Sequence, residues 1–537
     1  MSLVNAPLDG IPGLKQNWKS DLISGFVIFL IALPLCLGIA MASGAPPMAG
    51  LLSGIVGGIV VSLLSGSYLT INGPAAGLIA VVLHSITTLG AGNNQLGFEY
   101  TLAVIVIAGA IQVGLGLLRA GNLTVYFPVS VVHGMMAAIG IIIISKQFYF
   151  ALGVTPQSKS ISGLLMEMPS SLAKVNPEIG IIGITSILII AILGKLKHPM
   201  IKKLPAPLVA VLAGMLLAVL FNVKDAHSYT VFNMTYEISP KFLVNLPDKI
   251  SDGIVFPNFA LIGKGIFWVM VATVALIASI ESLLTASAID KVDPYNRHSN
   301  MNKELIAKGV GNFALGWIGG LPIIAEVVRS SANINNGAKT RWSNFFHGMF
   351  LLVFVLLLPN IIHMIPLASL AGILIMVGVK LASPTEFYHT YKRGWDQILV
   401  FLVTLILTIV EDLLVGVAAG IVTKLLIQLY FGVPLKNLFL SDIHFEYNDG
   451  NIVFVIKKAL IFSNMISLKR DLAKIPQGRH LIIKVDSVEF IGYSAFDFLS
   501  DFKRDYERNG GTVTIDGLES LHPLADHSLS SRHRKHI

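Results

Sequence analysis

Long apolar stretches constrain the fold of this chain more than any other feature. Charged residues make up only 13% of its 537 residues, which is about half of their share in a soluble domain. An apolar helix of about 20 residues crosses the hydrocarbon core of a bilayer. The sequence therefore predicts a polytopic α-helical membrane protein. We predict seven apolar segments at 22–43, 46–66, 73–90, 99–118, 127–145, 178–194 and 205–222, and seven more at 264–289, 304–319, 322–336, 343–363, 366–382, 396–410 and 413–431.

Two of these segments, at 73–90 and 322–336, are short and interrupted. They open with Gly73-Pro74 and Leu321-Pro322, and a proline cannot continue a preceding helix. Both are the third segment of their set of seven. A unit with an odd number of crossings that occurs twice has inverted topology, so the two interrupted helices are expected to meet from opposite sides. Irregular backbone at that depth is tolerated only where it is buried in protein or lines a cavity.

The starts of the two interrupted helices are the predicted substrate-binding site. The first N–H groups of a helix have no intrahelical partner and attract anions. We expect these donors at Ala75, Ala76, Gly77, Ile324, Ala325 and Glu326. The alternative is that the two prolines only mark helix boundaries in loops. The correspondence between the two halves favours the binding site.

Arg329 is a charged residue inside an otherwise apolar region, which is a functional hypothesis by default. It follows Glu326 by three residues. In one interpretation the guanidinium adds positive charge beside a bound anion. In the other it forms an ion pair, with Glu326 in the same helix or with Glu281 in another segment.

Glu281 and Glu326 are the candidate coupling residues, with Thr285 one helical turn after Glu281. Nothing else in 266–289 is ionisable. A carboxylate in that environment must be protonated, paired or bound to a cation, because an isolated charge there costs several kcal/mol. An ionised Glu326 would repel an anion, whereas a protonated one can donate a hydrogen bond to it. We therefore expect one or both glutamates to take up a proton with the substrate.

The positive charges predict the orientation in the membrane. Lys and Arg gather in four loops between apolar segments, at Lys195, Lys197, Lys202 and Lys203, at Lys291, Arg297 and Lys303, at Lys339 and Arg341, and at Lys392 and Arg393. Such loops face the cytoplasm, so both termini are expected there, with residues 1–20 as a cytoplasmic lead. This distribution also explains the net charge of +8 without a nucleic-acid partner. The single cysteine, Cys36, excludes an intrachain disulfide and a cysteine-rich metal site.

The composition changes at about residue 438. Residues 443–447, 452–456, 481–486 and 512–516 have the pattern of strands, and 464–474 and 494–508 have helical periodicity. They predict a small soluble α/β domain over 438–537, large enough to fold alone. We expect the polar tail with His522, His527, His533 and His536 to be frayed. A metal site in it is not expected, because no ligand spacing recurs on a defined element.

Several motifs together resemble the sulfate permease (SulP) family. They are Gly73-Pro-Ala-Ala-Gly77, Ser279-Ile-Glu-Ser-Leu-Leu-Thr285 and Gly319-Gly-Leu-Pro followed by Arg329-Ser-Ser-Ala-Asn333, and the C-terminal domain resembles the STAS domain of that family. The resemblance implies two inverted seven-helix repeats over 21–433. Segments one to four and eight to eleven would form a mobile core, and segments five to seven and twelve to fourteen a gate. It also implies a homodimer, a substrate between helices three and ten, and elevator-like transport.

The resemblance further implies roles for individual residues. It places an arginine at the position of Arg329 near the substrate, and an acidic residue linked to the coupling ion at the position of Glu281. In sodium-coupled bicarbonate relatives, oxygens from the start of helix ten complete the ion site. Here that start reads Ile323, Ile324, Ala325 and Val327, with few side-chain oxygens, which weakens the sodium assignment.

The sequence thus favours a secondary active transporter of a small inorganic oxyanion of the sulfate or bicarbonate class, coupled to protons, in the cytoplasmic membrane. The alternatives are a sodium-coupled bicarbonate symporter, an uncoupled anion exchanger and a membrane-anchored regulatory protein. No catalytic residue set, metal ligand set or cofactor motif occurs, so we do not expect an enzyme. Ser494 is expected to be an ordinary helix N-cap rather than a phosphorylation site, since Gly492 replaces the usual Asp. The STAS domain is expected to stabilise, dimerise or regulate, and it can bind regulatory partners.

Overall fold

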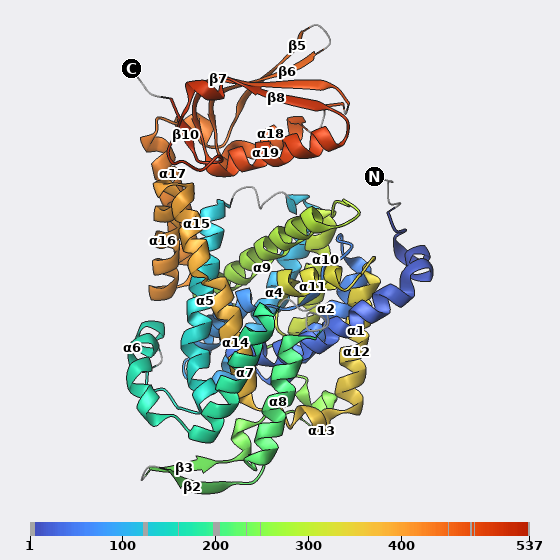
Figure 1. Cartoon of the computed structure of the whole chain (residues 1–537), viewed down its shortest axis with the longest axis vertical. Coiled ribbons are helices and arrows are strands. Elements are labelled where there is room, and N and C mark those ends of the chain that lie inside the picture. The colour runs from blue at the N-terminus through green and yellow to red at the C-terminus, as the bar shows by residue number, and fades with distance from the viewer. Residues whose placement is uncertain are drawn as a thin grey trace. The chain divides into compact units, whose positions relative to one another are not determined.

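A computed structural model describes residues 6–121, 127–158, 160–196, 204–231, 234–247, 249–448, 451–472, 475–476 and 478–534 (Figure 1). The chain forms two compact units. The first consists of residues 1–121 and 139–381, and the second of residues 122–138 and 382–537. Each unit is described by itself below.

All fourteen predicted apolar segments contain a helix. The first seven are α1 (Gly10–Ala42), α2 (Pro47–Leu64), α3 (Ile79–Gly90), α4 (Asn94–Leu117), α5 (Val129–Leu152), α7 (Pro177–Lys195) and α8 (Ala206–Leu220). The second seven are α9 (Gly265–Val292), α10 (Met301–Ile318), α11 (Val327–Asn335), α12 (Trp342–Leu357), α14 (Leu367–Leu381), α16 (Trp395–Val410) and α17 (Leu413–Tyr430). Within the described residues, eight helices are long and apolar enough to cross a membrane. The predicted division into core and gate stays a prediction.

Polar side chains define the starts of several of these helices. Asn93 accepts hydrogen bonds from the first N–H groups of α4, and Asn176, Asn300 and Asp412 do the same for α7, α10 and α17. Each satisfies a donor that has no partner within its helix. Helix boundaries inside an apolar chain are therefore set by single polar residues.

The two interrupted segments contain short strands where the sequence predicted helix. β1 (Asn72–Pro74) pairs antiparallel with β4 (Ile323–Ala325), with Gly73 opposite Ile324. A 3-10 helix follows β1 over Ala76–Leu78 and leads into α3. The helix predicted over 322–336 begins only at Val327. The physical reason is that buried backbone groups near a proline need partners, and the two broken segments supply them to each other.

The long polar connections carry additional elements. They are α6 (Ile161–Ser171), the hairpin of β2 (His227–Val231) and β3 (Met234–Ile238), and α15 (Pro384–Arg393), where the sequence predicted only loops. The predicted segment 343–363 is divided into α12 and the short α13 (Pro359–Ile362).

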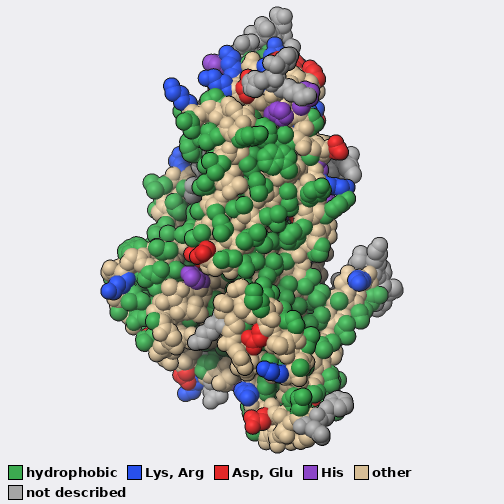
Figure 2. All heavy atoms as spheres, turned by 90° about the vertical axis from the view of Figure 1, so that its left-hand side faces the viewer, with side chains coloured by type: hydrophobic (Ala, Val, Ile, Leu, Met, Phe, Trp, Pro, Cys, Tyr) green, Lys and Arg blue, Asp and Glu red, His purple; other side chains and the backbone are tan. Residues whose placement is uncertain are grey.

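Exposed apolar side chains cover α16 and α17. Leu402 and Ile406 on α16, and Val422 and Leu426 on α17, are exposed. Figure 2 shows a face of the molecule on which hydrophobic side chains predominate over a broad area. A surface of this kind suits lipid rather than water.

The C-terminal domain is the predicted α/β fold. Its elements are β5 (Asp442–Asn448), β6 (Asn451–Leu460), α18 (Met465–Leu472), β7 (His480–Ile491), α19 (Tyr493–Arg508), β8 (Thr512–Asp516), β9 (His522–Pro523) and β10 (Arg532–His533). The strands form one sheet in the order β5-β6-β7-β10-β9, and β8 also pairs with β7. Phe454, Ile483 and Leu499 belong to its apolar core. The four predicted strands and two predicted helices are confirmed.

Two expectations about this domain are wrong. The tail is not frayed as far as it is described, because Arg532 pairs with Ile491 of β7 and His533 with Phe490; His536 lies outside the described residues. Ser494 is not the N-cap of α19. That position belongs to Gly492, and the N–H of Tyr493 donates to Ser531 Oγ (3.1 Å) from the returning tail.

Candidate functional site

The contact between β1 and β4 brings the starts of α3 and α11 to one place from opposite halves of the chain. These are the elements that the sequence predicted to meet. Ala75 and Ala76 are buried at this contact, and Gly77 is half-buried. The structure thus groups the predicted binding residues of both halves.

The first helix start has open backbone donors. Ala75 is extended (φ −127°, ψ 150°) and has no side-chain cap. Ala76 and Gly77 are the first residues of the 3-10 helix, so their N–H groups point out of its start without an intrahelical acceptor. The N–H of Leu78 already donates to the Ala75 carbonyl (3.1 Å). Ala76 and Gly77 are therefore the donors of this half-site.

Gly77 also leaves room for Glu281 of α9. A Cβ atom at residue 77 would lie 2.0 Å from Glu281 Oε2, which is far inside van der Waals contact. The glycine therefore lets the carboxyl group approach the backbone at the helix start. Glu281 is half-buried, and within the described residues its side chain has no hydrogen bond or ion pair. Thr285 follows one turn later on the same helix and is buried.

The second half-site differs from the prediction for Ile324, Ala325 and Glu326. Ile324 and Ala325 lie in β4, before the helix start, and the N–H of Glu326 donates to the Ile71 carbonyl (2.9 Å), so Glu326 is not an open donor. Val327 and Val328 are the first two residues of α11 and supply that half's open N–H groups. The sequence reasoning missed them, because it placed the helix start at the proline.

Glu326 is the N-cap of α11. Its Oε2 accepts a hydrogen bond from the N–H of Arg329 (2.9 Å) and lies 3.6 Å from the Arg329 Nε. A carboxylate at a helix start is stabilised by the helix dipole and by the donor that it caps. The signal in the sequence was an acidic residue three positions before the residue that it caps. The structure thus gives Glu326 a structural function as the cap of α11.

Arg329 is fully buried and joins α11 to the end of β1. Its Nη2 donates to the Pro74 carbonyl, and its Nη1 lies 3.7 Å from Cys36 Sγ. Of the two interpretations left open by the sequence, the ion pair with Glu326 is present. Because Pro74 directly precedes Ala75, the guanidinium bound to the Pro74 carbonyl also brings positive charge to the first half-site.

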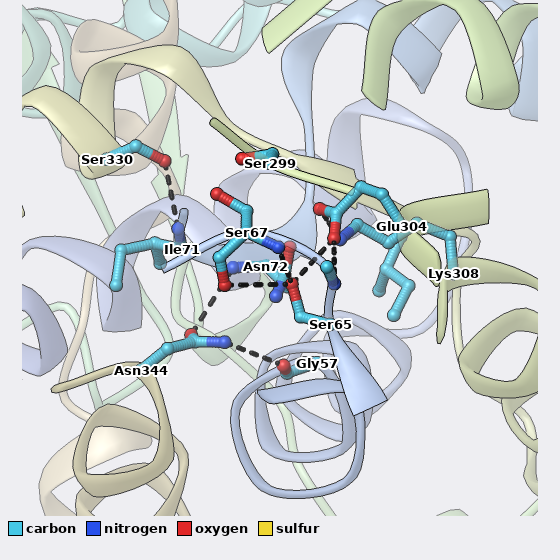
Figure 3. A network of polar contacts seen from close by, with 12 residues as sticks. Gly57, Ser65, Ser67, Ile71, Asn72, Ser299, Glu304, Lys308, Ser330 and Asn344 are labelled. Carbon is cyan, nitrogen blue, oxygen red and sulfur yellow. Dashed lines mark hydrogen bonds and ion pairs between the residues drawn. The ribbon is translucent and has the colours of Figure 1, made fainter. Parts of the chain in front are cut away.

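Polar side chains of α11 and α12 hold the chain that leads to β1 (Figure 3). Ser330 Oγ accepts from the N–H of Ile71 (2.9 Å), and Asn344 Oδ1 accepts from the N–H of Asn72 (3.3 Å). Asn333 Nδ2 donates to the Leu69 carbonyl (3.0 Å). No function was expected of Ser330, Asn333 or Asn344 from the sequence. Their signal was the polar run that follows Arg329 in an apolar region.

The described residues contain no group of three or more His, Cys, Asp or Glu side chains that could hold a metal ion. The chemistry that the arrangement offers is therefore that of backbone donors, one buried guanidinium and two carboxyl groups.

The chain is similar to known proteins. Residues 18–404 match the family model "Sulfate permease family", and residues 442–520 match the "STAS domain" model. YvdB of Bacillus subtilis (strain 168), provisionally named a sulfate transporter, is 26% identical over 513 residues, covering 94% of this chain and 92% of YvdB. The bicarbonate transporter BicA of Picosynechococcus is 27% identical over 408 residues, covering 76% of this chain and 69% of BicA.

Two solved structures have the same fold. The transmembrane domain of a cyanobacterial bicarbonate transporter BicA superposes with a TM-score of 0.64 at 26% identity, covering 76% of this chain and 98% of that chain. The murine anion transporter Slc26a9 in its inward-facing state superposes with a TM-score of 0.67 at 17% identity, covering 93% and 85%.

Proposed function

Because the chain belongs to the sulfate permease family, we propose that it is a secondary active transporter of a small oxyanion of the sulfate or bicarbonate class. The observation that carries this proposal is the pairing of β1 with β4. It brings two helix starts with open N–H donors together between the halves of a membrane protein, where transporters bind their substrates.

The anion would lie between Ala76 and Gly77 on one side and Val327 and Val328 on the other. Each helix start carries about half a positive charge, and the low dielectric of the surroundings strengthens its effect on an anion. Arg329 is buried, and its guanidinium at the Pro74 carbonyl adds a full positive charge near the anion. Backbone donors bind any oxyanion, so this site suits sulfate and bicarbonate alike.

We propose that transport is coupled to protons through Glu281. Glu326 is held by Arg329 and by the start of α11, whereas Glu281 has no such partner within the described part of the chain. A lone carboxyl group in a membrane is most stable when it is protonated. Glu281 in that form would face the anion without repelling it and could donate a hydrogen bond to it.

Sodium coupling is the second candidate. It requires oxygen ligands near Glu281. The side chains of β4 are Ile323, Ile324 and Ala325, which offer none, so Thr285 and backbone carbonyls would have to complete the site. In uncoupled anion exchange, the third candidate, Glu281 would neither take up a proton nor bind a cation during transport.

The remaining features of the proposal follow the family. Helices α1 to α4 and α9 to α12, the predicted segments one to four and eight to eleven, would carry the anion as a core that slides against the gate, and the protein would work as a homodimer. Both termini and the STAS domain would face the cytoplasm, in keeping with the positive loops.

Uptake by proteoliposomes tests the proposal. Purified protein is reconstituted, and uptake of labelled sulfate and of labelled bicarbonate is measured under an imposed proton gradient, an imposed sodium gradient or neither. We expect uptake of at least one anion to rise when the outside is acidic and to be indifferent to sodium. Uptake that needs sodium and ignores pH would replace protons by sodium as the coupling ion. Liposomes without transport of either anion would refute the proposed function.

A further inference from the structure

The linker of residues 65–71 leads from α2 into β1 and so into the first half-site. Nearly all of this linker is buried, so neighbouring elements restrict its backbone conformation. The corresponding linker of the second half, residues 319–322, is shorter. It is held by neutral side chains: Ser53 Oγ accepts from the N–H of Leu321 (2.7 Å), and Asn312 Oδ1 accepts from the N–H of Ile323 (2.6 Å).

The longer linker is held instead by a buried ion pair on α10. Glu304 and Lys308 are both fully buried, and Lys308 Nζ donates to Glu304 Oε1. The other carboxylate oxygen of Glu304 accepts from Ser65 Oγ (2.6 Å) and from the N–H of Gly66 (3.0 Å). Figure 3 shows Ser65, Ser67 and Asn72 between Glu304 on one side and Asn344 on the other. The ion pair therefore fixes the start of the linker.

The close approach at Gly66 confirms how tightly this start is held. The Gly66 carbonyl accepts from the N–H of Asn300 (3.0 Å). A Cβ atom at residue 66 would lie 2.0 Å from the Asn300 carbonyl oxygen. The backbone of the linker thus lies directly against the start of α10.

The rest of the linker is anchored by neutral side chains, through Asn333 at the Leu69 carbonyl and Ser330 at the N–H of Ile71. Among the described residues, no partner is present for Ser67 Oγ, for Thr70 Oγ1 or for either amide atom of Asn72, although all of these atoms are buried. Charged groups hold the start of the linker: Glu304 accepts from Ser65 Oγ and from the N–H of Gly66, and Arg341 Nη1 donates to the Ser65 carbonyl (2.6 Å). Hydrogen bonds to charged groups are the stronger ones.

Stability alone does not explain the charge of this pair. Burying two ions carries a large desolvation cost, and an apolar pair of similar volume is often equally stable or more so. The Glu304 carboxylate instead holds two donors of the linker, Ser65 Oγ and the N–H of Gly66, in one defined position.

We propose that Glu304 is a positioning residue for the substrate site. Its carboxylate, oriented by Lys308, fixes Ser65 and Gly66 and thereby places β1 and the open donors of Ala76 and Gly77. This inference rests on the proposed transport function only for its kinetic test, because the position of the linker can be measured separately.

The kinetic test compares two double variants in the proteoliposome assay with labelled sulfate and labelled bicarbonate. Glu304→Met with Lys308→Met removes both charges and the acceptor. Glu304→Gln with Lys308→Met also removes both charges but keeps a side-chain oxygen for Ser65 and Gly66. We expect the first variant to raise KM about tenfold. The second variant keeps hydrogen bonds that are weaker than those to a carboxylate, so we expect it to raise KM by no more than about threefold.

A second buried ion pair provides the matched control. Lys424 Nζ lies 2.8 Å from Asp396 Oδ2 between α16 and α17, which belong to the other unit. Asp396→Leu with Lys424→Met should lower the yield or the thermal stability without raising KM. An unchanged KM in the Met/Met variant, or the same rise in both Glu304 variants or in the control, would overturn the positioning function.

Thiol labelling tests the position of the linker without any transported anion. Ser67 is 2% exposed, and Ser67→Cys in a Cys36→Ala background should react slowly with a maleimide. We expect the Met/Met variant to react about tenfold faster, since its linker opens more often, and the Gln/Met variant to react no more than about threefold faster. Faster labelling without transport of either anion would support the positioning of the linker and refute the transport function. Equal labelling in all three proteins would refute the positioning itself.

Discussion

Glu281 and Gly77 depend on each other for space. A methyl group at residue 77 would meet the Glu281 carboxylate at 2.0 Å, and the end of that flexible side chain would have to move away. The protein should therefore fold, but with the Glu281 carboxyl group displaced from the first half-site.

We accordingly expect Gly77→Ala to lower anion uptake by about tenfold or more, because a small displacement in a site has a large effect. The matched control is Gly114→Ala in α4, where an added Cβ meets nothing within 4 Å. The measurement is initial uptake per amount of folded protein. Equal rates for Gly77→Ala and the parent would show that the spacing at residue 77 is unimportant.

Replacing Glu281 separates its function from that of Glu326. If protonated Glu281 accompanies the anion, uptake rises as the outside pH falls, and Glu281→Gln, which cannot lose a proton, should remove that dependence. Glu326→Gln keeps an oxygen to cap α11 and should retain it. Uptake is measured between pH 5 and pH 8, a range of about three units over which a carboxyl group in an apolar site can titrate. A pH profile that is flattened only in Glu326→Gln would assign the proton to Glu326 instead.

At the scale of elements, α11 is short and is held by its polar face rather than by apolar packing. Arg329, Ser330 and Asn333 are all fully buried. Asn333 alone contacts three other segments, through Leu69, Ser24 and Ser343. A helix of this length has little stability of its own, so these contacts set its position.

We expect Asn333→Leu to destabilise the protein by about 3 kcal/mol, because it leaves several buried polar groups without partners. The control is Asn335→Leu, two residues later on the same helix, where the side chain is exposed and the effect should stay within about 0.5 kcal/mol. Thermal unfolding in detergent compares the two. Similar unfolding midpoints for both variants would contradict the conclusion that the polar face of α11 holds this helix in place.

At the scale of the whole molecule, the C-terminal tail belongs to the second unit's structure. Ser531 Oγ donates to Asp396 Oδ2 (2.9 Å) and accepts from the N–H of Tyr493 (3.1 Å). The tail thus connects the last membrane helices with the start of α19. Phe431 at the end of α17 stacks on Phe490 of β7, with ring centroids 5.3 Å apart, which supports the same connection.

Truncation after Leu521 should therefore weaken the whole unit. It removes β9 and β10 and takes one of three polar partners from Asp396. We expect a loss of about 2 kcal/mol, seen as a midpoint of thermal unfolding several degrees lower. Ser520→Ala, which affects only a local bond to the Gly517 carbonyl, serves as the control. A truncated protein as stable as the parent would show that the tail is dispensable for folding.

The sequence by itself determined the apolar helices, the place of the two interruptions and the α/β character of the C-terminal domain. These follow from local properties: the number of apolar residues that a bilayer requires, the effect of proline on a helix, and the alternation of strands. The candidate residues Glu281, Glu326 and Arg329 were found for a similar reason, since a charge inside an apolar segment is visible without any structure.

Only the tertiary structure decided how these parts act together. That Pro74 accepts from Arg329, that Glu326 caps α11 and that Glu304 holds Ser65 and Gly66 depends on segments far apart in the chain. The start of the second interrupted helix moved from Pro322 to Val327 because Ile323–Ala325 pair with β1 as a strand. Unsatisfied backbone groups and buried charges are resolved by whatever the fold brings beside them, and no local pattern contains that information.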